Sequence, residues 1–105
     1  CPTLIIDKNN SPTTLGSAGS SRIISATLSV INNLISGKMS LKESISRSRI
    51  HLEGDILHCE PNTNQMRYTT KNIILWEDKN MYFGGVNACS SFESFSDKRR
   101  DGFSI

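Results

Sequence analysis

The sequence predicts an α+β fold in which two helices pack on an antiparallel sheet. Three observations lead to this prediction. The chain opens with two short strand-like segments joined by a turn. An amphipathic helix follows over residues 22–36, and the last third of the chain is again strand-like, most clearly over residues 81–91. The length of 105 residues is enough for one small domain.

The opening segment reads as a hairpin. Residues 3–7 (TLIID) predict a strand, and residues 13–15 can return as its partner. The intervening turn, KNNSP, contains the Asn and Pro residues that favour a bend. A glycine- and serine-rich loop, residues 16–21, then leads into the helix.

The helix predicted over residues 22–36 carries two adjoining rows of mostly apolar side chains and one row of small polar ones. The rows are Ile24, Leu28, Ile31 and Ile35; Ile23, Thr27, Val30 and Leu34; and, on the opposite side, Ser25, Ser29, Asn32 and Ser36. We therefore expect a wide buried face and a narrow, uncharged polar strip. Ser20 or Ser21 can cap its start, and Gly37 can end it.

The rest of the chain predicts a second helix and several strands. Ser40-Leu41-Lys42-Glu43 is a capping box, from which a helix would run to about Ser48 and bury Leu41 and Ile45. The later segments comprise a strand at 56–60, an ambiguous stretch at 62–70 that allows a short helix, an apolar run at 73–76, a strand at 81–91 and a last hairpin or edge strand at 94–105. Gly84-Gly85 marks a bulge or a close backbone approach.

Charge and cysteine content exclude several classes of protein. Lys plus Arg is 12 and Asp plus Glu is 10, and a net charge of +2 argues against a nucleic-acid or membrane partner held mainly by charge. No stretch approaches the roughly 18 apolar residues of a membrane span. The three cysteines are widely spaced without a C-x-x-C pair, which predicts neither a disulfide framework nor a structural zinc site. A start at Cys1-Pro2, without Met or a signal segment, suggests a fragment or a processed subunit.

The most informative local feature is the junction of residues 16–21 with the helix. A helix N-terminus leaves backbone N–H groups unpaired, and small residues let a phosphate, a carboxylate or a developing oxyanion come close. The junction lacks both the Gly-Lys-Ser/Thr ending of a P-loop and the G-x-G-x-x-G pattern. Plain turn glycines, or a small anion-binding module, remain open as alternatives.

Other candidate groups have less support from their spacing. They are His51, His58 and Cys59 as metal ligands; Glu53, Asp55 and Glu60 as paired carboxylates; residues 98–100 (Lys-Arg-Arg) as a phosphate site; and Cys1 as an N-terminal nucleophile. For the histidines, surface or satisfied core positions are the simpler expectation. For the basic run, the flanking Asp97 and Asp101 favour local ion pairs.

Six blocks of the sequence, taken in order, match the motifs of one enzyme family. Residues 1–5 read CPTLI, residues 16–24 GSAGSSRII, residues 37–45 GKMSLKESI, residues 49–51 RIH, and the end of the chain FGGVNA and DKRRDG. These blocks resemble segments of γ-glutamyltranspeptidases, which there read SPTIV, GSPGGSRI, GMDL with a following EAV, PRIH, FGG and DPRRxG. The resemblance covers nearly the whole chain, and its order makes it specific.

The resemblance implies an N-terminal-nucleophile hydrolase fold, an αββα sandwich of two antiparallel sheets between helices. Residues 1–105 would be one partial domain, the C-terminal part of the small subunit. Family precursors cleave themselves into a large and a small subunit, and the new N-terminal Thr attacks a γ-glutamyl amide such as that of glutathione. The Thr and the residues that hold the glutamyl group would lie upstream of this chain. The implied partners are the other subunit segments and a γ-glutamyl substrate, with no cofactor, metal, nucleic acid or membrane. Family members suggest a periplasmic or extracellular location.

Within this chain the resemblance assigns the oxyanion hole to the backbone N–H groups of Gly19 and Ser20. Ser20 replaces the family's second glycine. Ala18 and Ser48 replace prolines, and Leu52 replaces a polar residue. Because of these departures, a catalytically inactive relative that acts as a binding or structural protein remains the alternative. The block at residues 97–100 is expected to be structural, an internal ion-pair cluster.

Overall fold

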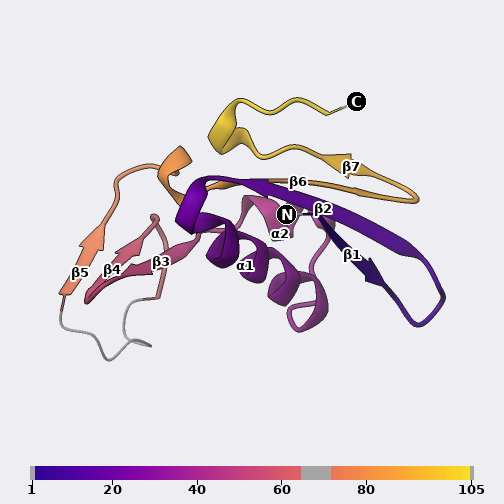
Figure 1. Ribbon diagram of the computed structural model, residues 1–105, viewed down its shortest axis with the longest axis horizontal. Helices are drawn as coiled ribbons and strands as arrows, with labels where there is room; N and C mark the ends of the chain where they lie inside the picture. The colour runs from indigo at the N-terminus through magenta and orange to yellow at the C-terminus, as the bar shows by residue number, and fades with distance from the viewer. Residues whose placement is uncertain (1, 65–71, 105) are drawn as a thin grey trace.

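The computed structural model describes residues 2–64 and 72–104, which form two sheets and a helix layer (Figure 1). The larger sheet is antiparallel in the order β1 (Thr3–Ile6), β2 (Pro12–Ala18), β6 (Gly85–Ser90), β7 (Ser94–Phe95). The smaller sheet has the order β3 (Ile50–Glu53), β4 (Ile56–Cys59), β5 (Asn72–Leu75). The helices are α1 (Ile23–Ile35) and α2 (Leu41–Ser46), with 3-10 turns η1 (Ser20–Arg22), η3 (Met81–Phe83) and η4 (Lys98–Arg100).

The larger sheet confirms the predicted N-terminal hairpin and extends it. β1 and β2 pair antiparallel, with Thr3 opposite Leu15. β2 continues through Gly16, Ser17 and Ala18, where Ala18 lies opposite Gly85 of β6. The prediction of a loop over residues 16–21 is therefore wrong for residues 16–18, which belong to β2. Pairing with β6, which is distant in sequence, holds these small residues extended, and the free turn is reduced to Gly19 and Ser20.

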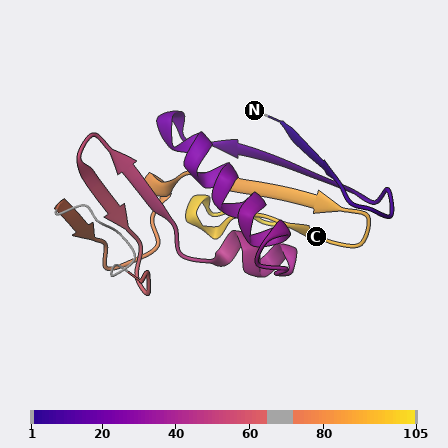
Figure 2. The same ribbon diagram turned by 90° about the horizontal axis from the view of Figure 1, so that it is seen from below.

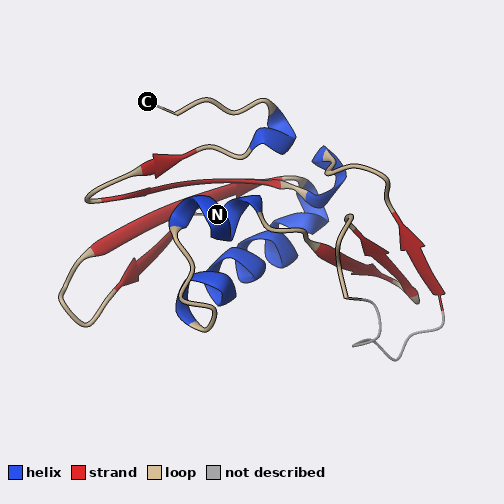
Figure 3. Ribbon diagram, turned by 180° about the vertical axis from the view of Figure 1, so that it is seen from behind, coloured by secondary structure: helices blue, strands red, loops and turns tan. Residues whose placement is uncertain are grey.

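The helix layer lies on one face of the larger sheet, and the core fills the space between them (Figure 2). The buried apolar residues of this core come from both helices and from β2 and β6. They are Leu15, Ala26, Val30, Leu41, Ile45, Val86 and Ala88. Helices packed on an antiparallel sheet are the predicted α+β arrangement (Figure 3).

α1 forms where it was predicted, but its start and its buried face differ from expectation. Its N-cap is Arg22, with no side-chain cap, so capping by Ser20 or Ser21 is wrong. The η1 turn takes the place of a cap, because the Ile23 N–H donates to the Ser20 carbonyl. Only the sheet-facing side is covered: Val30 is buried, whereas three apolar residues of the other row are 59–70% exposed. They are Ile24, Leu28 and Ile35.

α2 confirms the capping box. The Glu43 N–H donates to Ser40 Oγ at 3.2 Å, and the Ser40 N–H donates to Glu43 Oε2 at 3.1 Å. Leu41 and Ile45 are buried as predicted, while the helix ends at Ser46, two residues earlier than expected. The extended backbone of Arg47 stops it.

Replacing Ser40 with alanine is expected to lower the free energy of unfolding by about 1 kcal/mol, because the Glu43 N–H loses its acceptor, Ser40 Oγ. Urea denaturation measures the change. Ser36→Ala is the matched control, since Ser36 is exposed at the C-terminal end of α1 and its side chain makes no hydrogen bond among the described residues. An equal loss from both variants would contradict the prediction.

The smaller sheet and the late elements depart from the predicted strands in two ways. β4 and β5 pair parallel, not antiparallel, which the long connection at residues 60–71 permits. Residues 81–83 form the η3 turn, and the predicted strand begins only at Gly85. Residue 62 lies in a turn, and residues 63–64 have no regular secondary structure. The remainder of the ambiguous stretch, residues 65–70, lies outside the described residues, as do Cys1 and Ile105.

None of the helices in the described part of the chain has the length and apolar character needed to cross a bilayer.

Candidate active site

The turn between β2 and η1 is the candidate site. Gly19 has φ 140° and ψ 29°, and Ser20 has φ 56°, so two consecutive residues adopt positive φ. A Cβ on Gly19 would lie 2.8 Å from the Gly84 Cα, so only glycine fits. Gly84, with φ 74°, is therefore the close backbone approach that the Gly84-Gly85 pair predicted.

The two amides of this turn are not used to hold the fold. The Gly19 carbonyl accepts the Arg22 N–H at 3.2 Å, which closes the turn. Neither the Gly19 N–H nor the Ser20 N–H donates a hydrogen bond to another atom of residues 2–64 and 72–104. Two adjacent amides in such a turn are a typical anion-binding arrangement.

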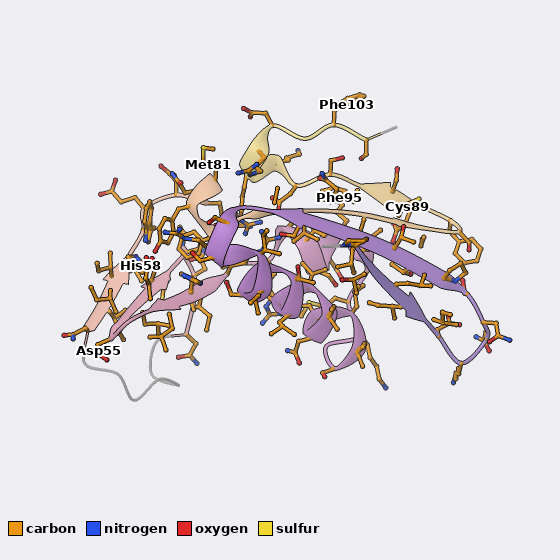
Figure 4. All side chains as sticks on the ribbon, in the orientation of Figure 1. Asp55, His58, Met81, Cys89, Phe95 and Phe103 are labelled. Carbon is orange, nitrogen blue, oxygen red and sulfur yellow. The ribbon has the colours of Figure 1, made fainter. Side chains whose placement is uncertain are left out.

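An open hollow of about 540 Å³ adjoins the turn. Gly19 and Ser20 form one part of its lining, and the stacked rings of Trp76 and Tyr82, 4.8 Å apart at their centroids, form another. Arg100 of the η4 turn completes it. Figure 1 shows η3 and η4 close to the start of α1, and Figure 4 places Met81 at this end of the molecule. The hollow thus gathers residues from three segments distant in sequence, 19–22, 76–82 and Arg100.

Arg22 ties the turn to the smaller sheet. Its guanidinium carbon lies 4.2 Å from the centre of the Tyr82 ring, and Nη2 is 3.3 Å from Glu53 Oε2. The Tyr82 hydroxyl donates to the same carboxylate oxygen at 2.8 Å. The hydrogen bond from Tyr82 and the charge of Arg22 lower the pKa of Glu53, which keeps it ionised at neutral pH.

The structure gives no support to a metal site at His51, His58 and Cys59. His51 Nδ1 is 2.9 Å from Ser25 Oγ, and His58 Nδ1 accepts a hydrogen bond from Trp76 Nε1 at 3.2 Å. Cys59 is buried, and burial raises the pKa of its thiol. Among the residues that the structure describes, no three metal-ligating side chains of His, Cys, Asp or Glu come together. The two histidines instead belong to the aromatic cluster around Tyr82. Figure 4 labels His58, which lies on β4.

The block at residues 97–100 is structural, as predicted, because it closes a buried ion-pair cluster. Arg49 Nη2 lies 2.7 Å from Asp97 Oδ2, and Arg99 Nη1 lies 3.2 Å from Asp97 Oδ1. Arg99 Nε donates to Glu60 Oε1 at 2.6 Å. We call Arg49, Glu60, Asp97 and Arg99 the buried ion cluster.

Two alternatives from the sequence fail at this cluster. The phosphate-site reading of residues 98–100 is wrong for Arg99, whose guanidinium is committed to Glu60 and Asp97. The pairing of Glu60 with a second carboxylate is wrong as well. Glu60 is fully buried against Arg99 and the Arg49 N–H, and Glu53 is bound by Arg22 and Tyr82.

Sequence reasoning missed Trp76, Tyr82 and Arg100 as neighbours of the candidate turn. Their only local signal was an aromatic pair that flanks the Glu-Asp-Lys-Asn turn and precedes Gly84-Gly85. Their approach to Gly19 depends on the β2–β6 pairing and on Gly84, neither of which a local pattern specifies.

Solved structures with the same architecture define the class of fold. The transpeptidase CapD of Bacillus anthracis matches with a TM-score of 0.79 at 23% identity, over 100% of this chain and 69% of that one. A mutant gamma-glutamyltranspeptidase of Helicobacter pylori matches with 0.76 at 28% identity, over 94% and 60%. The gamma-glutamyltranspeptidase of Pseudomonas nitroreducens complexed with L-DON matches with 0.75 at 23% identity, over 100% and 60%. The fold is thus part of an N-terminal-nucleophile hydrolase sandwich.

The family follows from the sequence itself. The family profile described as Gamma-glutamyltranspeptidase matches residues 1–104. The chain belongs to the gamma-glutamyltranspeptidase family, and it spans 60–69% of the length of the solved chains named above. Comparison with curated proteins gave no match.

Proposed function

We propose that this chain supplies the oxyanion hole of an enzyme that transfers or hydrolyses γ-glutamyl groups. The observation that carries the proposal is the turn itself. The N–H groups of Gly19 and Ser20 have no acceptor within residues 2–64 and 72–104, and both residues line the hollow. Membership of the gamma-glutamyltranspeptidase family supplies the reaction class.

The proposed reaction has two acyl-transfer steps. The hydroxyl oxygen of an N-terminal Thr, contributed from outside this chain, attacks the γ-carbonyl carbon. The C–N bond breaks, and the amine leaves with the proton that the hydroxyl gave up. Water or an acceptor amine then attacks the ester, releases the γ-glutamyl product and restores the hydroxyl. In each step the carbonyl oxygen becomes negative, and the amides of Gly19 and Ser20 stabilise that charge.

The serine at position 20 is compatible with this role. Its φ of 56° keeps the left-handed backbone that a glycine would adopt most easily, so the departure from the family motif leaves the backbone donor in place. This supports the catalytic proposal over the inactive relative.

Ser20→Gly is expected to leave kcat within about twofold, because the donor is the main-chain N–H and not the side chain. The variant should gain up to about 1 kcal/mol in unfolding free energy, because glycine relieves the strain of a left-handed serine. The greater flexibility that glycine gives the unfolded chain opposes this gain and limits its size. Steady-state kinetics and urea denaturation measure the two effects.

Ser21→Gly is the matched control for this variant, because Ser21 lacks a positive φ and lies inside η1. It should lose stability. A large loss of kcat in Ser20→Gly, with the fold intact, would show that the serine side chain matters and would contradict the backbone role.

The chain is also proposed to pack against the remaining large- and small-subunit segments of its precursor. Large apolar side chains on α1 and β1 lie exposed in the described residues, and contiguous exposed apolar surface marks a protein interface. They are Leu4, Ile6, Ile24, Leu28 and Ile35. In this proposal, the exposed apolar row of α1 is covered by another segment of the precursor.

The test uses the complete precursor that carries this chain, with L-γ-glutamyl-p-nitroanilide as substrate. Release of p-nitroaniline is expected, and alanine replacement of the N-terminal Thr should abolish it. No release by the correctly cleaved, folded protein would overturn the proposal and favour the inactive relative.

A further inference from the structure

The hollow beside the candidate oxyanion turn has the chemistry of a binding site for a carboxylate with an apolar or aromatic neighbour. Its lining in the described residues includes Arg22 and Arg100 and no acidic residue. Trp76 and Tyr82 provide a stacked aromatic surface whose planes differ by 21°. Positively charged side chains beside aromatic side chains suit an anionic organic molecule.

The two arginines differ in what they already hold. Arg22 is occupied, because it lies over the Tyr82 ring and pairs with Glu53. The Arg100 side chain forms no hydrogen bond or ion pair with the rest of residues 2–64 and 72–104, and Arg100 is exposed. The nearby acid Asp97 is taken by Arg49 and Arg99. Arg100 is thus the cation that is available to a ligand.

Gly85 directs Arg100 along the start of β6 towards the hollow. A Cβ on Gly85 would lie 2.6 Å from Arg100 Cδ and 3.0 Å from Cγ, so the arginine stem occupies the space that a side chain would take. Gly85 pairs with Ala18, the residue before Gly19. The arginine stem therefore passes close to the strand end that carries the two amides.

We propose that this hollow binds the acyl acceptor, and that Arg100 pairs with the acceptor's carboxylate while Trp76 and Tyr82 contact its side chain. The acceptor class is an amino acid or peptide with a free carboxylate, preferably with an aromatic or apolar side chain. This inference rests on the proposed function, because the acceptor must reach an ester whose carbonyl oxygen lies at Gly19 and Ser20. Its amine attacks that ester carbon, the ester C–O bond breaks, and the proton lost by the amine returns to the Thr oxygen, which leaves the new γ-glutamyl amide and the free hydroxyl.

The experiment measures transfer from L-γ-glutamyl-p-nitroanilide to L-phenylalanine and to L-phenylalaninamide, which lacks the carboxylate. The complete processed protein is used, and the γ-glutamyl products are quantified by chromatography. Arg100→Gln should lower the acceptor kcat/KM about tenfold for phenylalanine and less than twofold for the amide. Comparing each variant with wild type on the same acceptor removes the difference in amine basicity between the two acceptors.

Two further variants sharpen the comparison. Lys98→Gln removes an exposed cation from the same turn that does not line the hollow, so it should change neither acceptor. Gly85→Ala keeps the charge but displaces the flexible arginine stem, so it should reproduce the selective loss for phenylalanine. Together the variants show whether the acceptor preference depends on where the Arg100 charge lies or only on the net charge of the protein.

The outcomes distinguish this inference from the proposed function. If donor hydrolysis without acceptor proceeds but Arg100→Gln affects both acceptors equally or neither, the acceptor site is overturned and the proposed function stands. If the wild type hydrolyses the donor and transfers to neither acceptor, the inference also falls. Absence of any p-nitroaniline release overturns both.

Discussion

Replacing Asp97 with alanine is expected to lower the free energy of unfolding by about 3–5 kcal/mol. Asp97 is 2% exposed and joins Arg49 to Arg99. It also accepts the backbone N–H of Val86 at 3.0 Å, which anchors the η4 segment to β6. Alanine would leave Arg49 buried with a charge and no carboxylate, which costs far more than a lost surface pair.

The measurement is urea denaturation at pH 7 of Asp97→Ala and of Asp78→Ala. Asp78 is exposed in the turn after β5, so its loss should change stability by less than about 0.5 kcal/mol. Equal effects of the two variants would show that the buried ion cluster does not stabilise the fold.

Because of the same carboxylate, we expect the free energy of unfolding to fall in acid. Burial acts to raise the pKa of Asp97. The opposite effect is larger in sum, because the charges of Arg49 and Arg99 and the N–H groups of Val86 and Arg99 all stabilise the carboxylate. The pKa of Asp97 therefore lies below its usual value. The unfolded chain therefore binds the proton more readily than the folded one. The contribution of Asp97 is complete above about pH 4 to 5 and is lost as pH falls through the lowered pKa. Asp97→Asn should weaken this dependence between pH 5 and 3. An unchanged profile would refute the assignment.

Local patterns predicted the helical part of the fold well because its determinants are local. The capping box needs only Ser40 and Glu43, three residues apart, and α1 needs only its apolar periodicity. Periodicity reports that a face is apolar, not what covers it. Ile24 and Leu28 are exposed here although their spacing matches that of Val30, which is buried. A local pattern therefore does not distinguish a buried apolar row from an exposed one.

The features that local patterns missed all depend on distant residues. The pairing of Gly16 and Ala18 with β6 made a strand of a predicted loop. Glu60 and Arg99 are 39 positions apart, so no spacing rule joins them. At the candidate site, the resemblance to known motifs selected Gly19 and Ser20. The aromatic wall and Arg100 became visible only when η3 and η4 were placed beside that turn.

Replacing Gly19 with alanine is expected to lower kcat/KM for a γ-glutamyl anilide at least 100-fold in the complete protein. The new Cβ would lie 2.8 Å from the Gly84 Cα, a backbone atom that cannot swing aside, and a φ of 140° is strained for alanine. The turn must shift to accommodate it. Misplacement by about 1 Å can cost about 100-fold, and loss of one oxyanion donor costs about 100- to 1,000-fold.

Gly16→Ala is the matched control, because Gly16 lies three residues earlier, on β2, and its Cβ would meet nothing within 4 Å. It should retain activity. Gly84→Ala tightens the same contact from the other side, with a Cβ 3.3 Å from the Ala18 carbonyl oxygen and a φ of 74°. Its activity should fall in the same direction as that of Gly19→Ala. Thermal unfolding separates lost catalysis from lost fold, since a displaced oxyanion hole lowers kcat in protein that remains folded. Full activity in a folded Gly19→Ala variant would mean that these amides do not stabilise the intermediate.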